Sequence, residues 1–331
     1  MTENADIIQS FSSAGKVLCC IAAGKDMTKL DIRRGTGLSM TTVISSVEAL
    51  TKRGLVTFEE VKGARGGKMR SVINVQETRR AYGVSYKSGV LTAVAVDLRG
   101  EMREVTVEEP PDGISPLGRV FAIVNTLRKK APPPIAVALS LNCAGKEEVL
   151  TELGERYRVP TVSLTNTEAA ACLGLWRGAP APVAALGLGS RVKCALAGAE
   201  CRRVTEVGAL PSPALMAGEG SYASALSAQA VEETLRTSRY HGKYRIERGR
   251  ITEVRDLADY SAALALTLSS LVSTVDLLLS PSRILLFGDY LTEAFCDRIK
   301  DSSGKVVYAR FGKEDFALGA AICALKECVF S

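Results

Sequence analysis

Alternating hydrophobic and polar positions in the first 75 residues predict two short helices followed by two strands. A first helix is expected over Thr28–Arg34, with Thr28 as its N-cap, and Gly35–Leu38 forms the turn that follows. Ser39 caps a second helix, which Gly54 ends. Strand-like runs follow at residues 55–58 and 71–75.

The second of these helices has one apolar face and one polar face. Its apolar side chains recur three and four residues apart and so face a core, namely Val43, Ile44, Val47 and Leu50. The opposite face is polar and is free to meet a partner, and it comprises Thr41, Ser45, Glu48 and Lys52.

The segment between the two strands, residues 62–68 (KGARGGK), is glycine-rich and cationic, like the tip of a wing. A helix with small polar side chains beside a basic arm suits the reading of a DNA groove. We therefore expect a winged helix-turn-helix over residues 1–80, although some winged helices bind protein instead. The expected DNA contacts are Thr28, Lys29, Ser39, Met40, Thr41, Thr42, Ser45, Arg65 and Lys68.

Charge supports a DNA partner for this segment. Residues 1–80 carry 13 lysines and arginines against 8 acidic side chains, a net charge of +5, whereas the whole chain carries +6. Nearly all of the excess positive charge therefore lies where phosphates would be neutralised. A surplus of five charges also falls within ordinary surface variation, so the charge supports the interpretation only together with the motif.

Beyond residue 81 the pattern changes to strands alternating with helices, in a chain whose length suits two or three domains. A strand hairpin followed by strand and helix occurs once from Gly83 and again from Val183. This repetition predicts a duplicated α/β architecture with lobes at about 81–180 and 181–331. A cleft between two such lobes is the expected place for a ligand.

Cysteine and hydropathy patterns indicate a cytoplasmic protein. The nine cysteines form no C-x-x-C motif, and the single histidine, His241, has no cysteine nearby, so we expect no metal site. The N-terminus lacks the pattern of a signal peptide. Residues 264–279 are strongly apolar, but serine, threonine and aspartate interrupt them, which predicts a buried helix and no membrane partner.

Several short motifs occur in an order typical of one family. They are Val96–Gly100 (VDLRG), Thr165–Ala171 (TNTEAAA), Leu186–Gly189 (LGLG), Thr205–Gly208 (TEVG), Tyr222–Ser224 (YAS) and Gly319–Ala321 (GAA). In these motifs the chain resembles the ROK family (repressor, open reading frame, kinase), and especially its repressor branch with an N-terminal winged helix-turn-helix. The resemblance implies an actin-like, hexokinase-like (ribonuclease H-like) domain over residues 81–331 that senses an effector and mediates oligomerisation.

The chain departs from the kinases of that family where their chemistry takes place. The resemblance implies an aspartate as general base and a zinc-binding histidine, but Asn166-Thr167 and Ala209 stand there. The first phosphate loop, residues 85–89, lacks the acidic residue and one glycine, and Arg191 and Lys193 replace later glycines of the second. We therefore expect no phosphotransfer, no catalytic residue and no cofactor.

The resemblance leaves two possibilities for the small ligand of this domain: a sugar-like effector is retained, or the effector has changed or been lost, for which Ala209 in place of the histidine counts. Asn142, Asn166 and Glu206 fall where relatives hydrogen-bond sugar hydroxyls, which the resemblance implies as ligand-binding positions. The alternative is that Asn166 caps the following helix, Glu206 is a surface charge and Asn142 is a turn residue. Arg191 and Lys193 leave open an anionic ligand such as a sugar phosphate, or simply a solvated loop.

Together these features predict a transcriptional regulator, a repressor of carbohydrate-related genes with an inactive sugar-kinase-like sensor domain. Its partners would be a double-stranded DNA operator and a sugar or sugar-phosphate effector. It would act as a homodimer or a dimer of dimers, because one winged head makes few contacts with DNA. The rival hypotheses are an ATP-dependent sugar kinase with an appended DNA-binding head, and a DNA-binding protein that needs no ligand.

Overall fold

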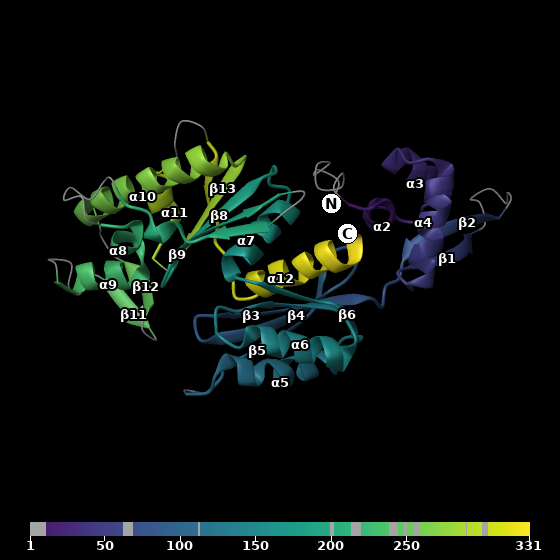
Figure 1. The fold of residues 1–331 in the computed structure, drawn as a ribbon, viewed down its shortest axis with the longest axis horizontal. Helices are drawn as coiled ribbons and strands as arrows, with labels where there is room; N and C mark the ends of the chain where they lie inside the picture. The colour runs from purple at the N-terminus through teal and green to yellow at the C-terminus, as the bar shows by residue number, and fades with distance from the viewer. Residues whose placement is uncertain are drawn as a thin grey trace. The chain divides into compact units, whose positions relative to one another are not determined.

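The computed structural model describes most of the 331-residue chain (Figure 1). The described residues are 11–61, 69–111, 113–198, 202–212, 220–237, 244–247, 250–254, 258–288, 290–299 and 304–331. They divide into two compact units. The first holds the described residues up to Ala169 together with Trp176–Gly178 and Lys313–Ser331, and the second holds Ala170–Leu175 and Ala179–Gly312.

The N-terminal head, which we define as residues 11–75, contains three helices and one hairpin. The helices are α2 (Ser13–Ala23), α3 (Lys29–Thr36) and α4 (Met40–Lys52), and the antiparallel strands are β1 (Val56–Val61) and β2 (Arg70–Val75). Thr28 caps α3 and Ser39 caps α4, which confirms both predicted caps. Gly37 ends α3 with a left-handed backbone, φ 69°, that favours glycine.

The two faces of α4 follow the predicted pattern. Val43, Val47 and Leu50 are buried, and Ile44 is half-buried. The predicted polar face is exposed along its whole length, at Thr41, Ser45, Glu48 and Lys52. The wing-tip residues Arg65 and Lys68 lie outside the described residues, so their predicted role stays a prediction.

The rest of the first unit is built on a five-stranded sheet. Its strands are β3 (Arg80–Lys87), β4 (Val90–Val96), β5 (Met102–Glu108), β6 (Pro134–Ser140) and β7 (Thr161–Leu164), in the order β5-β4-β3-β6-β7. Two helices cover one face, α5 (Pro116–Arg128) and α6 (Lys146–Tyr157), and α12 (Asp315–Leu325) covers the other (Figure 1). A final π-helical turn, η2 (Lys326–Phe330), ends the chain.

The backbone of α12 lies very close to the sheet. A Cβ added at Gly83 of β3 would lie 2.0 Å from the carbonyl oxygen of Ala317 and 2.5 Å from the amide nitrogen of Ala321. Because both neighbours are backbone atoms, only glycine permits this approach. The sequence assigned this C-terminal segment to the second lobe, whereas it packs within the first unit.

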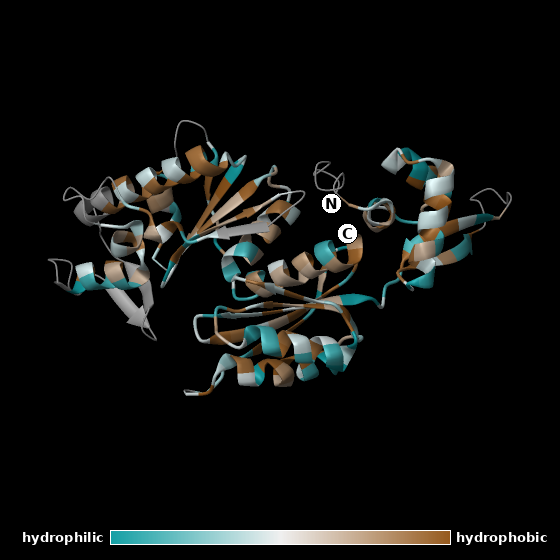
Figure 2. Ribbon diagram, in the orientation of Figure 1, coloured by the Kyte–Doolittle hydropathy of each residue, from teal (hydrophilic) through white to brown (hydrophobic). Residues whose placement is uncertain are grey.

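The second unit contains a sheet of the same strand order. Its strands are β8 (Val183–Leu188), β9 (Val192–Ala197), β10 (Arg202–Thr205), β13 (Arg283–Gly288) and β14 (Val306–Tyr308), in the order β10-β9-β8-β13-β14. In both sheets the first strand pairs antiparallel with the second and parallel with the fourth. Apolar residues follow the strands of each sheet (Figure 2).

Helices and a hairpin complete the second unit, and α7 (Asn166–Trp176) runs through both units. The others are α8 (Tyr222–Leu226), α9 (Ala228–Thr237), α10 (Ala258–Leu279), α11 (Glu293–Cys296), the 3-10 turn η1 (Val207–Ala209) and the strands β11 (Tyr244–Glu247) and β12 (Arg250–Val254). Ser227 has an extended backbone and separates α8 from α9.

The prediction that residues 264–279 form a buried helix is wrong in part. One side of α10 packs into the core through Leu264, Leu268, Leu271, Val272 and Val275. The opposite side is open, with Leu266 64% exposed and Leu277 83%, and Leu278 in the last turn of the helix is 63% exposed. Among the described helices, none has the length and apolar content that a membrane crossing needs.

The close packing of α12 yields a stability prediction. Gly83→Ala should lower the free energy of unfolding by about 1–3 kcal/mol, because the new Cβ meets backbone that cannot move aside. Gly118→Ala in α5 is the matched control, since a Cβ there has open space and should stabilise the helix by up to about 1 kcal/mol. Urea denaturation measures both, and equal effects of the two substitutions would contradict the packing argument.

Candidate functional sites

The exposed face of α4 is organised from its N-terminus. The Ser39 hydroxyl oxygen accepts the Thr42 N–H at 3.1 Å and lies 2.8 Å from the Thr42 hydroxyl. The Ser45 hydroxyl donates to the Thr42 carbonyl oxygen at 3.1 Å. These local bonds order the small polar side chains of the first turns, where Met40 is half-buried and Thr41 is exposed. The arrangement presents hydroxyl groups on an accessible helix surface, as contact with base edges requires.

Thr28 has a structural role in the head. Its hydroxyl donates to the Asp31 carboxylate at 2.6 Å and accepts the Asp31 N–H at 3.2 Å, while Asp31 also accepts the Thr28 N–H at 3.0 Å. This reciprocal capping box satisfies two of the free donors at the start of α3. The hydrogen bonds from Thr28 hold the pKa of Asp31 below its usual value. The next residue, Lys29, is exposed on the first turn of α3.

Sequence reasoning missed two further cations on α3. Arg33 and Arg34 are both exposed, and Arg33 lies one helical turn after Lys29. Exposed arginines of this kind suit contact with phosphate oxygens. The signal was available, because both residues contribute to the excess positive charge of residues 1–80, but a net charge does not show which cations are exposed.

Asn166 uses its amide group to hold the first unit together. Its Nδ2 donates to the Tyr86 carbonyl oxygen at 3.0 Å, and its Oδ1 accepts the Ser140 hydroxyl at 2.6 Å. Ser140 is completely buried at the end of β6, so this bond satisfies a hydroxyl with no access to water. The amide thereby joins α7 to the ends of β3 and β6.

The alternative that Asn166 caps α7 is wrong, because Thr165 does so. The Thr165 hydroxyl oxygen accepts the Glu168 N–H at 3.3 Å, and the Glu168 carboxylate accepts the Thr165 N–H at 2.6 Å. Asn166 is the first residue of the helix proper. The position where the resemblance implies a kinase base thus carries an amide that is bonded to groups of the fold, and the adjacent Thr167 is buried.

The other two expected ligand residues are exposed. Asn142 follows β6 in the first unit. Glu206, in the second unit, is 52% exposed and pairs with Arg191 at 2.9 Å and Lys193 at 3.5 Å. The Arg191 hydrogen bond is the main cause that lowers the pKa of Glu206, so the carboxylate stays charged and neutralised by its partners. This pairing weakens the hypothesis that Arg191 and Lys193 await an anionic ligand.

The segment expected at the first phosphate loop is a tight two-residue turn. Lys87 and Val90 are directly paired in the β3–β4 hairpin, and the turn residues Ser88 and Gly89 have φ values of 56° and 80°. The Lys87 ammonium lies over the Phe316 ring, 5.3 Å from its centroid. A turn this short offers no run of amide groups to surround a phosphate. Within the described residues, no group of three or more His, Cys, Asp or Glu side chains suits a metal ion.

The geometry of Asn166 predicts that it matters more for stability than Asn142. Asn166→Ala should lower the free energy of unfolding by about 1–3 kcal/mol, because it leaves the buried Ser140 hydroxyl and the Tyr86 carbonyl without this partner. The exposed Asn142→Ala is the matched control and should change it by less than about 0.5 kcal/mol. Urea denaturation again gives both values. Similar stabilities of the two variants would show that the Asn166 amide is not needed for folding.

Comparison with solved structures finds this fold in ROK proteins. A ROK family transcriptional regulator, a homologue of the E. coli MLC protein, matches with a TM-score of 0.69 and 16% identity over 97% of each chain. A ROK hexokinase from Thermus thermophilus matches with a TM-score of 0.57 and 18% identity over 75% of this chain and 99% of its own. A ROK family glucokinase from Streptomyces griseus, in complex with glucose and AMPPNP, matches with a TM-score of 0.54 and 16% identity. The match covers 74% of this chain and 99% of the glucokinase.

Comparison of the sequence alone adds no relative. No protein-family model matches the chain, and no curated protein matches it. At 16 to 18% identity the structural similarity establishes the fold and not the activity. The mixed α/β architecture expected from the alternation of strands and helices is therefore confirmed: the chain has the fold found in a ROK transcriptional regulator and in ROK sugar kinases.

Proposed function

We propose that this protein is a DNA-binding transcriptional regulator, a repressor, whose residues 1–80 form a winged helix-turn-helix. The observation that carries the proposal is the exposed polar face of α4, which stands beside the cations of α3 and the β1–β2 hairpin. In this assignment α4 enters the major groove with Met40, Thr41 and Ser45 toward the bases. The hairpin is the wing, and Arg65 and Lys68 at its tip hold phosphate or enter the minor groove.

Residues 81–331 act as a duplicated, kinase-like sensor domain in this proposal. The common strand order of the two sheets supports the duplication. The extent of the structural matches supports the boundary near residue 80. The ROK regulator covers nearly the whole chain, whereas the kinases cover about the share that residues 81–331 make up.

The sensor domain does not transfer phosphate in our proposal. The position of the base is held by Asn166, whose amide is used in the fold, and the first phosphate loop is replaced by a two-residue turn. The rival, a sugar kinase with an appended head, draws its support from the kinases among the structural neighbours. Incubation with ATP and a panel of hexoses decides between them, and turnover that Glu206→Ala abolishes would favour the kinase.

The proposed effector is a sugar or a sugar phosphate. Support comes from a ROK glucokinase solved with glucose and another ROK family protein solved with sucrose, both of which share this fold. Binding of the effector would shift the population of the regulator away from the arrangement that fits the operator. The genes controlled would then be carbohydrate-related, and the protein would act in the cytoplasm. Thermal shift with sugars and sugar phosphates tests for an effector, and no stabilisation by any of them would favour the ligand-independent rival.

Operator binding through α3 and α4 predicts the effect of charge removal. Arg33→Ala together with Arg34→Ala should weaken binding to a selected genomic fragment and lower the slope of log affinity against log salt by about 2. Lys129→Ala together with Lys130→Ala in the first unit is the matched control, because it removes two exposed cations far along the chain from the head. Fluorescence anisotropy at several salt concentrations measures the slopes. An unchanged slope in the arginine double variant would place the phosphate contacts elsewhere.

Pairing of two copies is also proposed, as a homodimer or a dimer of dimers, because a twofold assembly doubles the contacts with a palindromic operator. The exposed leucines of α10 supply a suitable surface. Leu266 and Leu277 lie three turns apart on one side of the helix, with the exposed Ser273 between them. An uncharged stripe with leucine at both ends matches itself when two copies meet antiparallel about a twofold axis.

Self-association through this stripe predicts that Leu277→Glu produces monomers. The new carboxylates would face an apolar surface and lose hydration without gaining a partner. Sedimentation velocity measures the species present, and Val107→Glu, at an exposed position in β5, is the matched control. A monomeric native protein at micromolar concentration, or equal dissociation of both variants, would contradict the α10 contact.

A further inference from the structure

We infer that α2 is the element through which the first sheet sets the position of the DNA-reading helix α4, and that Arg99 and Phe330 are the positioning residues that hold α2. The inference rests on the proposed function for the role of α4. The contacts that support it all lie within the first unit and connect the head to the β4–β5 turn, to η2 and to the end of α7.

Within the head, α2 is the support of α4. The α2 helix packs against both α3 and α4, and three of its side chains, Val17, Leu18 and Ile21, are completely buried. A close-packed interface of this kind transmits displacement, because its side chains cannot be compressed. A change in the position of α2 therefore moves α4 with it.

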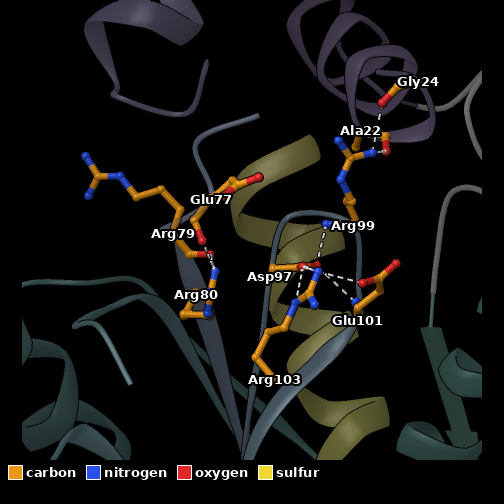
Figure 3. A network of polar contacts seen from close by, with 9 residues as sticks. All are labelled: Ala22, Gly24, Glu77, Arg79, Arg80, Asp97, Arg99, Glu101 and Arg103. Carbon is orange, nitrogen blue, oxygen red and sulfur yellow. Dashed lines mark hydrogen bonds and ion pairs between the residues drawn. The ribbon is translucent and has the colours of Figure 1, made fainter. Parts of the chain in front are cut away.

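Arg99 holds the C-terminal end of α2 (Figure 3). Its guanidinium donates to the carbonyl oxygen of Ala22 and, at 2.9 Å, to that of Gly24. Carbonyl groups at a helix C-terminus lack intrahelical donors and carry partial negative charge, so a cation placed there is favourable. Arg99 belongs to the turn after β4, which makes this a direct bond between the sheet and the head.

The turn that carries Arg99 is itself fixed by a buried carboxylate. Asp97 accepts the backbone N–H of Arg99 at 2.8 Å and that of Glu101 at 3.0 Å (Figure 3). The Arg103 guanidinium donates to the second carboxylate oxygen at 2.6 Å and 2.5 Å. The charge of Asp97 is thus paired and hydrogen-bonded, as a buried charge requires. These bonds fix the backbone of the turn from which the Arg99 side chain extends.

The N-terminal half of α2 rests on the last residues of the chain. A Cβ added at Gly15 would lie 1.7 Å from the Phe330 carbonyl oxygen, so the helix backbone touches η2 directly. The Phe11 and Phe330 rings have centroids 5.7 Å apart. Arg53, the C-cap of α4, donates to the Cys328 carbonyl oxygen at 3.4 Å. Phe330 is completely buried at this junction.

Trp176 connects both holding points of α2. Its ring stacks on Phe330 with centroids 6.5 Å apart and an interplanar angle of 5°. It also lies against Gly100 of the Arg99 turn, since a Cβ there would come within 2.2 Å of the indole. Trp176 is the last residue of α7, whose first residue is Asn166. One helix, about 16 Å long, therefore runs from the expected ligand segment to the contacts that hold the head.

These contacts form a route from sensor to operator: α7 displaces Trp176, Trp176 displaces Phe330 and the Arg99 turn, and α2 carries the movement to α4. The alternative is that the β2–β3 connection alone tethers the head to the sheet. In that connection Arg79 donates to the Gly54 carbonyl oxygen at 2.8 Å. Tethering alone would leave DNA binding insensitive to changes at Arg99 or Phe330.

The test uses the full chain with Phe330→Ala and, separately, Arg99→Ala. Amide hydrogen exchange across α2 should accelerate about tenfold in both variants and stay unchanged in β6. Affinity for a duplex with two copies of the sequence that the native protein selects from random DNA should fall about tenfold, while affinity for one copy stays unchanged. Arg99→Lys, which keeps the charge, should recover part of the loss. Phe121→Ala and Arg119→Ala are the matched controls.

Each outcome decides the inference. Unchanged exchange of α2 in both variants would overturn it, and so would an equal loss of affinity for one and two copies, because that would indicate damage to the head rather than its misplacement. If the native protein binds no DNA, the proposed function fails. The exchange of α2 would then support or overturn the connection by itself.

Discussion

The first unit depends on the backbone contact between its last helix and its first strand. Because Gly83 has no side chain, α12 lies against β3 at a distance that no other residue permits, and the final turn η2 then reaches the N-terminal head. The two ends of the described chain meet there through Phe11 and Phe330. Packing of a glycine in the sheet thus determines which residues support the head.

The polar groups of the candidate sites serve the fold as well as any ligand. Asn166 satisfies Ser140 and Tyr86, and Glu206 is neutralised by Arg191 and Lys193. An amide such as Asn166 cannot accept a proton as a general base, and its donor and acceptor are already used within the fold. These bonds agree better with the function that we propose, a sensor domain, than with phosphotransfer.

The parts of the structure that local physics determines were predictable from the sequence. Caps at Thr28 and Ser39 and the two faces of α4 depend on neighbours within a few residues, and the structure agrees with them. Contacts between distant residues were not predictable. Asn166 bonds to two residues that precede it by 26 and 80 positions in the sequence. Arg99 bonds to the end of α2, some 75 residues earlier. The exposure of Leu277 was missed because apolar content does not reveal which side of a helix lacks a partner.

The central claim is that the exposed face of α4 docks against duplex DNA. Hydrogen exchange of the full chain, with and without a genomic fragment that it retains, tests this claim most directly. The account predicts slower exchange at residues 28–52 when DNA is bound, and a return to the free rate at high salt. Protection confined to other parts of the chain, with α3 and α4 unchanged, would contradict it.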